Sequence, residues 1–262
     1  MTNQSNDQNS ERAFYDSFWR TQLALSCDEK CRMRFILSEV KRLCNSLVAS
    51  DRAVSLAISP DRAGRAASDQ FRIADVGCGR GWLTHLLSQF GEVTGFDRSI
   101  TEARKRHPAG RFVECNVLDL PPEDFDVAVC SEVIEHVQTE EQSKLIDSLF
   151  SILRPGGALI MTTPNKPQVS RLVGELSLQH ELQPVENWLD DQELIHLAGR
   201  LFEIKKVRTI MFFPIAVRKI GPLSRVYRAL YEQVLAYRVV DPLLQWTKQG
   251  LYIGLIARKG VG

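Results

Sequence analysis

A short apolar run at residues 71–76 leads directly into a glycine-rich stretch at residues 77–81, after which a helical pattern begins. Glycine lets the backbone turn tightly and approach a ligand with no side chain in the way. A strand, a glycine-rich loop and a helix in this order are typical of sites that bind nucleotide cofactors. The stretch therefore predicts a cofactor-binding loop. Its members are Gly77, Cys78, Gly79 and Gly81.

The residues around this loop distinguish two classes of cofactor. The fingerprint of dinucleotide sites is Gly-x-Gly-x-x-Gly/Ala, and its third small position is occupied here by Trp82, which is too large for a close contact between helix and strand. The third glycine, Gly81, comes one residue early instead. Asp75, just before the loop, can bind the positively charged amino group of a methionine moiety, for which NAD has no counterpart. These features favour S-adenosylmethionine.

Polar residues also stand at the ends of the next two expected strands. Asp97 ends the run 92–97, and a carboxylate in this place can accept hydrogen bonds from both hydroxyls of a ribose. Asn116 follows the run 111–115, and its side-chain carbonyl can accept a hydrogen bond from the amino group of an adenine, with the Val117 backbone nearby. The sequence thus offers partners for a whole nucleoside.

A cluster of acids and a base follows the apolar run 125–130, and consists of Glu132, Glu135 and His136. Methyl transfer from a sulfonium is an in-line displacement at carbon, so the protein must align donor and acceptor and remove any proton that the acceptor carries. Histidine is suited to that proton transfer, which makes His136 the candidate base. The same spacing on a loop or first helical turn could instead hold a divalent ion with oxygen and nitrogen ligands.

These residues need a parallel sheet to bring them together. Beyond residue 70, short apolar runs alternate with amphipathic segments, which predicts a mostly parallel sheet covered by helices on both faces. In such a sheet a ligand lies at the carboxyl ends of the strands, where the chain order switches direction. Strands are expected at 71–76, 92–97, 111–115, 125–130, 157–163, 202–210 and 250–258. Helices are expected at 80–90, 99–107, 138–153 and 190–199.

The bulk composition is that of one catalytic domain. A chain of 262 residues with 44% hydrophobic residues can form a packed α/β domain. No run of about 18 uncharged apolar residues occurs, and the N-terminus lacks the charged-then-apolar pattern of a signal peptide. We therefore expect a cytoplasmic protein. The six cysteines are scattered and are expected to be reduced thiols.

Two segments lie outside the core of the expected sheet. Residues 1–10 predict a disordered tail, and helical spacing of apolar residues predicts a helical cap over 11–58, followed by a polar linker. An insertion at 211–249 separates the last two expected strands. It contains a predicted helix that begins at Pro222 and runs to about residue 240, before Pro242 interrupts it.

The insertion is both basic and apolar. Residues 200–262 carry 12 basic and 3 acidic side chains, on a chain whose net charge is +1. This pattern is typical of an interfacial helix or of a lid over an apolar, anionic substrate. We therefore expect residues 211–249 to cover the acceptor pocket or to contact a membrane surface, with an ordinary amphipathic helix as the alternative.

Five motifs in chain order show a family resemblance. Residues 71–163 resemble the core of class I S-adenosylmethionine-dependent methyltransferases, and the chain is similar to the group that contains the quinone-biosynthesis O-methyltransferases. Asn116 departs from the pattern, because the family more often has Asp there, although both side chains offer an oxygen. The motifs are Asp75–Gly81, Gly95–Asp97, Asn116–Pro121, Phe125–His136 and Leu153–Gly157.

The resemblance implies a seven-stranded, mostly parallel Rossmann-like sheet, with residues 70–262 as the methyltransferase domain. It also implies which part of the donor each candidate residue binds. Asp75 and the glycine-rich loop hold the methionine end of the donor and Asp97 holds the ribose. Asn116 and Val117 hold the adenine, and Ser131 borders the sulfonium.

Three functions remain open. The first is methylation of a small molecule on oxygen, with a quinone precursor, a lipid-linked compound or another secondary metabolite as acceptor. The second is metal-dependent RNA 2′-O-methylation, because Glu132, Glu135 and His136 resemble a metal-binding motif that such enzymes complete with a distant histidine, here His180. The lack of a clear single-strand-binding module speaks against nucleic acid. The third is cofactor binding without catalysis.

Overall fold

The structure is a computed structural model that describes residues 13–15, 17–20, 24–57, 71–176, 184–212, 221–232 and 235–261. The tail predicted at 1–10 and nearly all of the predicted linker lie outside these residues. The same holds for His180.

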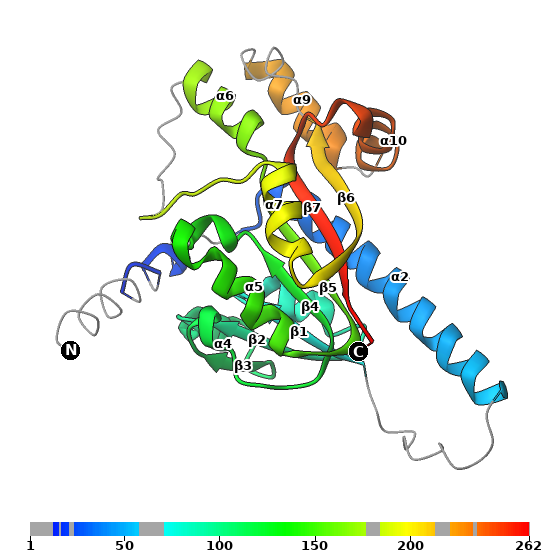
Figure 1. The fold of residues 1–262 in the computed structure, drawn as a ribbon. Helices are drawn as coiled ribbons and strands as arrows, with labels where there is room; N and C mark the ends of the chain where they lie inside the picture. Colours follow the sequence, from blue (N-terminus) through cyan, green and yellow to red (C-terminus); the bar gives the residue numbers. More distant parts are fainter. Residues whose placement is uncertain are drawn as a thin grey trace.

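A seven-stranded sheet with the order β3-β2-β1-β4-β5-β7-β6 forms the centre of the protein (Figure 1). Neighbours among β1 to β5 pair in parallel, and β7 runs antiparallel to both β5 and β6. The predicted fold class is therefore confirmed. The strands are β1 (Arg72–Val76), β2 (Glu92–Asp97), β3 (Arg111–Glu114), β4 (Phe125–Ser131), β5 (Leu153–Pro164), β6 (Phe202–Phe212) and β7 (Gly250–Lys259).

Both faces of the sheet are covered, because successive residues of a strand point to opposite sides. On one face, Val127 and Val129 of β4 pack in a cluster with α2 (Cys27–Ala57) and α3 (Trp82–Leu87). On the other, Ala128 and Cys130 pack with α5 (Gln142–Ser151) and α7 (Asp191–Gly199). Figure 1 shows α2 running past the sheet on the side away from α5 and α7. The chain order reverses between β1 and β4, which leaves a crevice at their carboxyl ends.

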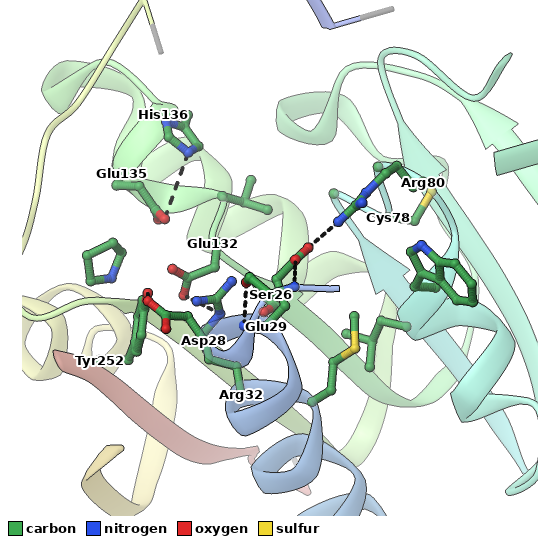
Figure 2. A pocket seen from close by; sticks show the side chains of 18 of the residues that line it. Ser26, Asp28, Glu29, Arg32, Cys78, Arg80, Glu132, Glu135, His136 and Tyr252 are labelled. Atoms are coloured by element: carbon green, nitrogen blue, oxygen red, sulfur yellow. Dashed lines mark hydrogen bonds and ion pairs between the residues drawn. The ribbon is translucent and has the colours of Figure 1, made fainter. Parts of the chain in front are cut away.

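Helix α2 begins with a capping box. The Ser26 hydroxyl accepts a hydrogen bond from the Glu29 backbone N–H at 3.1 Å, and the Glu29 carboxylate accepts one from the Ser26 N–H at 2.8 Å. This arrangement satisfies two N–H groups that have no partner within the helix. The box fixes where α2 starts, and its first turn lies beside the crevice, as Figure 2 shows for Asp28, Glu29 and Arg32.

Two further helices connect strands of the sheet. α4 (Thr101–Arg106) connects β2 to β3, close to the predicted range. α6 (Lys166–Leu176) follows β5, where the sequence analysis identifies no helix. Its second residue is Pro167, which is tolerated in the first turn of a helix because the N–H there has no helical partner.

The described part of the insertion contains α9 (Gly221–Glu232) and α10 (Leu235–Leu244), followed by one turn of 3₁₀ helix at Gln245–Thr247. The prediction that Pro242 interrupts a single helix is wrong, because Pro242 lies inside α10. Side chains on either side of it anchor this turn to β6. Asp241 accepts hydrogen bonds from the Met211 and Phe212 N–H groups at 3.0 and 3.1 Å, and Gln245 bonds to the backbone of Thr209. These bonds hold a helical turn that proline alone would disfavour.

Several large apolar side chains of the insertion face solvent. The most exposed is Trp246, whose exposed fraction is 82%. No helix among the described residues is sufficiently long and apolar to cross a membrane. Contact of this segment with a membrane surface stays a prediction. The other exposed apolar residues of the insertion are Leu223, Val226 and Leu243.

Candidate active site

A cavity of about 1140 Å³ lies at the crevice between the carboxyl ends of β1, β2 and β4. It brings together residues that the sequence analysis placed after three different strands. One end is lined by the glycine-rich loop and the other by the segment that follows β4. The predicted site residues that line it are Asp75, Gly77, Cys78, Gly79, Asp97, Val117, Ser131, Glu132, Glu135 and His136.

The glycine-rich loop is held against the end of β2. The N–H groups of Gly77 and Cys78 both donate to the Phe96 carbonyl, at 2.8 and 3.1 Å. The Gly79 N–H donates to Asp97 Oδ2 at 2.8 Å. Gly77 has a φ of +76°, and a Cβ there would lie 2.2 Å from Val133 Cγ2. Only glycine fits this position, because a side chain would suffer both the backbone strain and the clash.

A buried carboxylate, Asp75, and a partly buried one, Asp97, lie beside this loop. Asp75 is 1% exposed and accepts a hydrogen bond from the Thr84 hydroxyl at 2.6 Å. Burial raises the pKa of Asp75 to about 7, against the opposing effect of the Thr84 bond. Burial likewise raises the pKa of Asp97, while backbone N–H groups of Ser99 and Gly79 oppose that rise. Two acidic side chains are thus held in a poorly hydrated place, which favours a ligand that carries positive charge or hydroxyl donors.

Two predicted residues do not line the cavity. Gly81 caps the start of α3 with a φ of +76°. A Cβ there would lie 2.9 Å from the Phe112 ring of β3, so close packing of the helix on the sheet requires glycine at this position. Asn116 Oδ1 accepts from the Leu118 N–H at 3.1 Å and from Arg98 at 3.2 Å. That oxygen already has two donors, and its contact with an adenine stays a prediction.

At the opposite end, His136 is held by the backbone of the segment before α7. Its Nδ1 lies 2.9 Å from the Val185 carbonyl oxygen, and a carbonyl can only accept, so Nδ1 carries a proton. In the neutral imidazole, Nε2 is then free to accept a proton. Nε2 lies 3.9 Å from Glu135 Oε1 (Figure 2), and Nδ1 lies 3.9 Å from Glu186 Oε1.

The two glutamates after β4 have different surroundings. Glu135 is 1% exposed and accepts a hydrogen bond from the Thr163 hydroxyl at 3.1 Å, and burial raises its pKa well above the ordinary value. Glu132 has a φ of +58°, a left-handed conformation that non-glycine residues rarely adopt. Its Oε1 lies 3.6 Å from Nε of Arg32. Burial raises the pKa of Glu132, and Arg32 opposes the rise.

The sequence profile of the family described as "Methyltransferase domain" matches residues 34–207 of this chain. The match covers the glycine-rich loop, Asp75, Asp97 and the cluster after β4. The chain belongs to the methyltransferase domain family.

Similar proteins agree with this assignment. The mitochondrial ubiquinone biosynthesis O-methyltransferase of Rattus norvegicus is 35% identical over 117 residues, which are 39% of this chain and 33% of that protein. The ubiquinone biosynthesis O-methyltransferase of Idiomarina loihiensis is 31% identical over 122 residues, 42% of this chain and 49% of that protein. The similar stretch therefore spans between a third and a half of the length of these relatives. The predicted resemblance to S-adenosylmethionine-dependent methyltransferases is confirmed.

Solved structures with the same fold include the N-methyltransferase NodS of Bradyrhizobium japonicum in complex with S-adenosyl-L-homocysteine. It has a TM-score of 0.52 and 13% identity, over 86% of each chain. A methyltransferase of Methanosarcina mazei has a TM-score of 0.51 and 20% identity, over 78% of this chain and 99% of that chain. At these identities the likeness extends to the fold alone.

The N-terminal segment covers the donor end of the cavity in this methyltransferase, a feature that the apolar spacing of 11–58 did not predict. Trp19 packs on Gly79, where a Cβ would lie 2.9 Å from the indole ring. Arg80 of the glycine-rich loop is 3% exposed and forms an ion pair with Glu29 of α2 (Figure 2). Its guanidinium also lies over the Trp19 ring. The spacing of Ser26 and Glu29 indicates the start of a helix, but no local sequence pattern indicates that Glu29 pairs with Arg80, which is distant in the sequence.

The lid predicted at 211–249 stays a prediction, because part of that range lies outside the described residues. No described residue of that range lines the cavity. α9 and α10 pack against each other, α9 also packs against α2, and α10 against β6. The anchoring of Asp241 and Gln245 to β6 accounts for this placement.

No group of three or more His, Cys, Asp and Glu side chains that could hold a metal ion occurs in the described part of this methyltransferase. Near Glu132 the structure has the cation Arg32. The alternative metal set depends in part on His180, outside the described residues, and therefore stays a prediction.

Proposed function

We propose that this methyltransferase transfers a methyl group from S-adenosylmethionine to a hydroxyl oxygen of a small, largely apolar molecule of the quinone-precursor type. The observation that carries the proposal is the orientation of His136. Its Nδ1–H donates a hydrogen bond to the Val185 carbonyl, so Nε2 is the basic nitrogen. His136 lines the same cavity as the donor-binding residues.

The donor end suits S-adenosylmethionine. The glycine-rich loop lets a ligand approach the backbone closely, the buried Asp75 complements an ammonium group, and the partly buried Asp97 complements a pair of ribose hydroxyls. We assign the methionine amino group to Asp75, the ribose to Asp97, the adenine to the Val117 side of the cavity, and the neighbourhood of the sulfonium to Ser131.

The acceptor end suits proton removal followed by methyl transfer. S-adenosylmethionine, when bound, supplies a methyl group on a positively charged sulfur. The acceptor oxygen forms a bond to the methyl carbon as the carbon–sulfur bond breaks with its electron pair left on sulfur, and the hydroxyl proton goes to His136 Nε2. The carboxylate of Glu186, 3.9 Å from Nδ1, would stabilise the resulting imidazolium.

The lining and the relatives support an apolar acceptor with a hydroxyl. Apolar side chains of α6 contribute Val169 and Leu172 to the acceptor end, and Trp188 lies nearby in the lining. The curated relatives in Rattus norvegicus and Idiomarina loihiensis are named ubiquinone biosynthesis O-methyltransferases.

Two measurements test the proposed function together. Calorimetry should show binding of S-adenosylhomocysteine, and the purified protein should transfer a labelled methyl group from S-adenosylmethionine to 4-methylcatechol, a small apolar diphenol. Binding without transfer to this or related diphenols would favour a cofactor-binding protein without catalysis. Transfer to RNA ends that requires a stoichiometric metal would favour the RNA 2′-O-methyltransferase alternative.

We expect donor binding to weaken as the pH falls below about 7, the pKa of Asp75. Because the ionised carboxylate pairs with the ammonium group, protonated Asp75 must release its proton on binding. The affinity should then fall by up to about tenfold per pH unit. Calorimetric titrations with S-adenosylhomocysteine between pH 8 and 5.5 measure this slope. Asp75→Asn should bind weakly with a flatter pH dependence, and an unchanged slope in this variant would contradict the assignment.

The unliganded protein should show the linked effect on stability. The folded-state pKa of Asp75 is raised from 3.8 to about 7, so between these values the folded state holds a proton that the unfolded state has lost. The free energy of unfolding should therefore decrease as the pH rises through this range. At pH 8 the Asp75→Asn variant should melt at a higher temperature than the wild type, whereas at pH 4 the difference should nearly vanish.

A further inference from the structure

A partly buried arginine faces the acceptor end of the cavity. Arg32 comes from the second turn of α2, and 13% of its side chain is exposed. Its guanidinium lies over the Tyr252 ring, 4.3 Å from the ring centroid, and lines the cavity. Figure 2 shows Arg32 and Glu132 pointing toward one another, although they come from opposite sides of the cavity.

The guanidinium keeps its hydrogen-bond donors available. Its contact with Glu132 Oε1 measures 3.6 Å, too long for a hydrogen bond, and it forms none with any described residue. An arginine carries five N–H donors and a buried one normally uses several of them. Donors that face a cavity without a protein partner indicate a ligand group that accepts hydrogen bonds.

Glu132 holds this cation in place. Its left-handed backbone follows directly on Ser131, and its N–H donates to the Thr162 carbonyl at 2.9 Å. Strained backbone of this kind persists where the surrounding structure requires it, and it occurs often at functional sites. Burial alone would lower the pKa of Arg32, but the nearby groups Glu132, Tyr252 and Asp28 raise it above the ordinary value. Arg32 is therefore a permanent cation.

We propose that Arg32 donates hydrogen bonds to the reacting oxygen of the acceptor and stabilises it as an oxyanion, which selects phenolic or enolic hydroxyls over amines. This inference rests on the proposed function and specifies its acceptor. An oxygen nucleophile that loses its proton to His136 becomes negative before it bonds to the methyl carbon, and a fixed cation favours that state. An amine nitrogen becomes positive as it bonds to carbon, and the same cation opposes that state.

The test uses catechols of similar shape and different acidity: 4-methylcatechol, 4-chlorocatechol and 4-nitrocatechol. In Arg32→Met, kcat for 4-methylcatechol should fall about 100-fold, the loss typical for one stabilising donor of an oxyanion. For 4-nitrocatechol, which ionises readily without help, the loss should stay within about fivefold, and Arg32→Lys should recover part of the activity with 4-methylcatechol. The wild type should leave the matched amine 4-methylaniline unmethylated.

Arg42→Met is the matched control, because Arg42 lies on the same helix, pairs with Glu39 and does not line the cavity. It should behave as the wild type. Equal losses of kcat across the three catechols in Arg32→Met would overturn the inference, since they would indicate a structural role. Loss of S-adenosylhomocysteine binding in both Arg32 variants would also overturn it, by placing Arg32 in the donor site.

A measurement without turnover separates this inference from the proposed function. The absorbance of 4-nitrocatechol reports its ionisation, and in the presence of S-adenosylhomocysteine the bound compound should ionise at lower pH on the wild type than in solution. The shift should be absent in Arg32→Met and present in Arg42→Met. If the shift occurs but no methyl transfer does, the proposed function fails while the anion-binding role of Arg32 stands. If transfer occurs without the shift, only the role of Arg32 fails.

Discussion

Replacement of Asp97 by alanine should lower the affinity for S-adenosylhomocysteine by at least about 100-fold. A carboxylate that accepts two hydroxyl hydrogen bonds loses both in the variant, and hydrogen bonds to charged groups contribute about 1.5–3 kcal/mol each. Asp97 also accepts the Gly79 and Ser99 N–H groups, so its removal releases one attachment of the glycine-rich loop. Calorimetric titration of the folded variant, checked by circular dichroism, measures the effect.

Two further variants test whether the loss of affinity is specific to the Asp97 carboxylate. Asp97→Asn keeps one oxygen and loses the charge, so its affinity should lie between those of the wild type and the alanine variant. Asp119→Ala removes an exposed carboxylate that pairs with Lys144 and does not line the cavity, and it should bind as the wild type does. Wild-type affinity in Asp97→Ala would contradict both the ribose assignment and the use of this cavity for the donor.

The donor end could be predicted because each of its parts is local in sequence. The glycine-rich loop follows β1 directly, and Asp97 is the last residue of β2. Parallel strands bring their carboxyl ends to the same edge of the sheet, so residues after different strands meet without any further information. The burial of both faces of β4 likewise follows from its continuous apolar run.

The acceptor end also contains residues from segments that are distant in sequence from Glu132, Glu135 and His136, and these additional residues were not predicted. Tyr252 donates a hydrogen bond to Asp28 across 224 positions of the chain. Asp28 and Arg32 are four residues apart and therefore share one face of α2, but a search for apolar spacing passes over charged residues on a helix. Their function is visible only once the fold has placed them opposite Glu132.

Pro242 was interpreted too strictly as a helix breaker, and the helix that begins near Pro167 was not predicted. Pro242 lies within α10, where bonds from Asp241 and Gln245 to β6 hold the surrounding turn. Pro167 lies in the first turn of α6, a position that proline tolerates. In each case tertiary contacts or helix position decided the outcome, and neither can be inferred from the presence of proline alone.

Replacement of His136 by alanine should lower kcat for 4-methylcatechol by about 10²- to 10⁴-fold, the usual contribution of a general base. Binding of S-adenosylhomocysteine should remain at the wild-type level, because His136 lies at the opposite end of the cavity from Asp75 and Asp97. Steady-state kinetics with labelled donor and calorimetry of the same preparation measure the two quantities. His196→Ala is the control, since His196 is exposed on α7.

A structural role for His136 would give a different pattern. Its Nδ1 bond to Val185 helps to hold the segment that carries Glu186 and Trp188, so a loss of activity alone would not identify a base. Imidazole added to the alanine variant should restore part of kcat if the missing group is a proton acceptor. His136→Asn, which can keep a donor toward the Val185 carbonyl but supplies no base, should stay as inactive as alanine. Recovery of activity in His136→Asn, with no rescue by imidazole, would show that His136 orients the segment and that the proton leaves by another route.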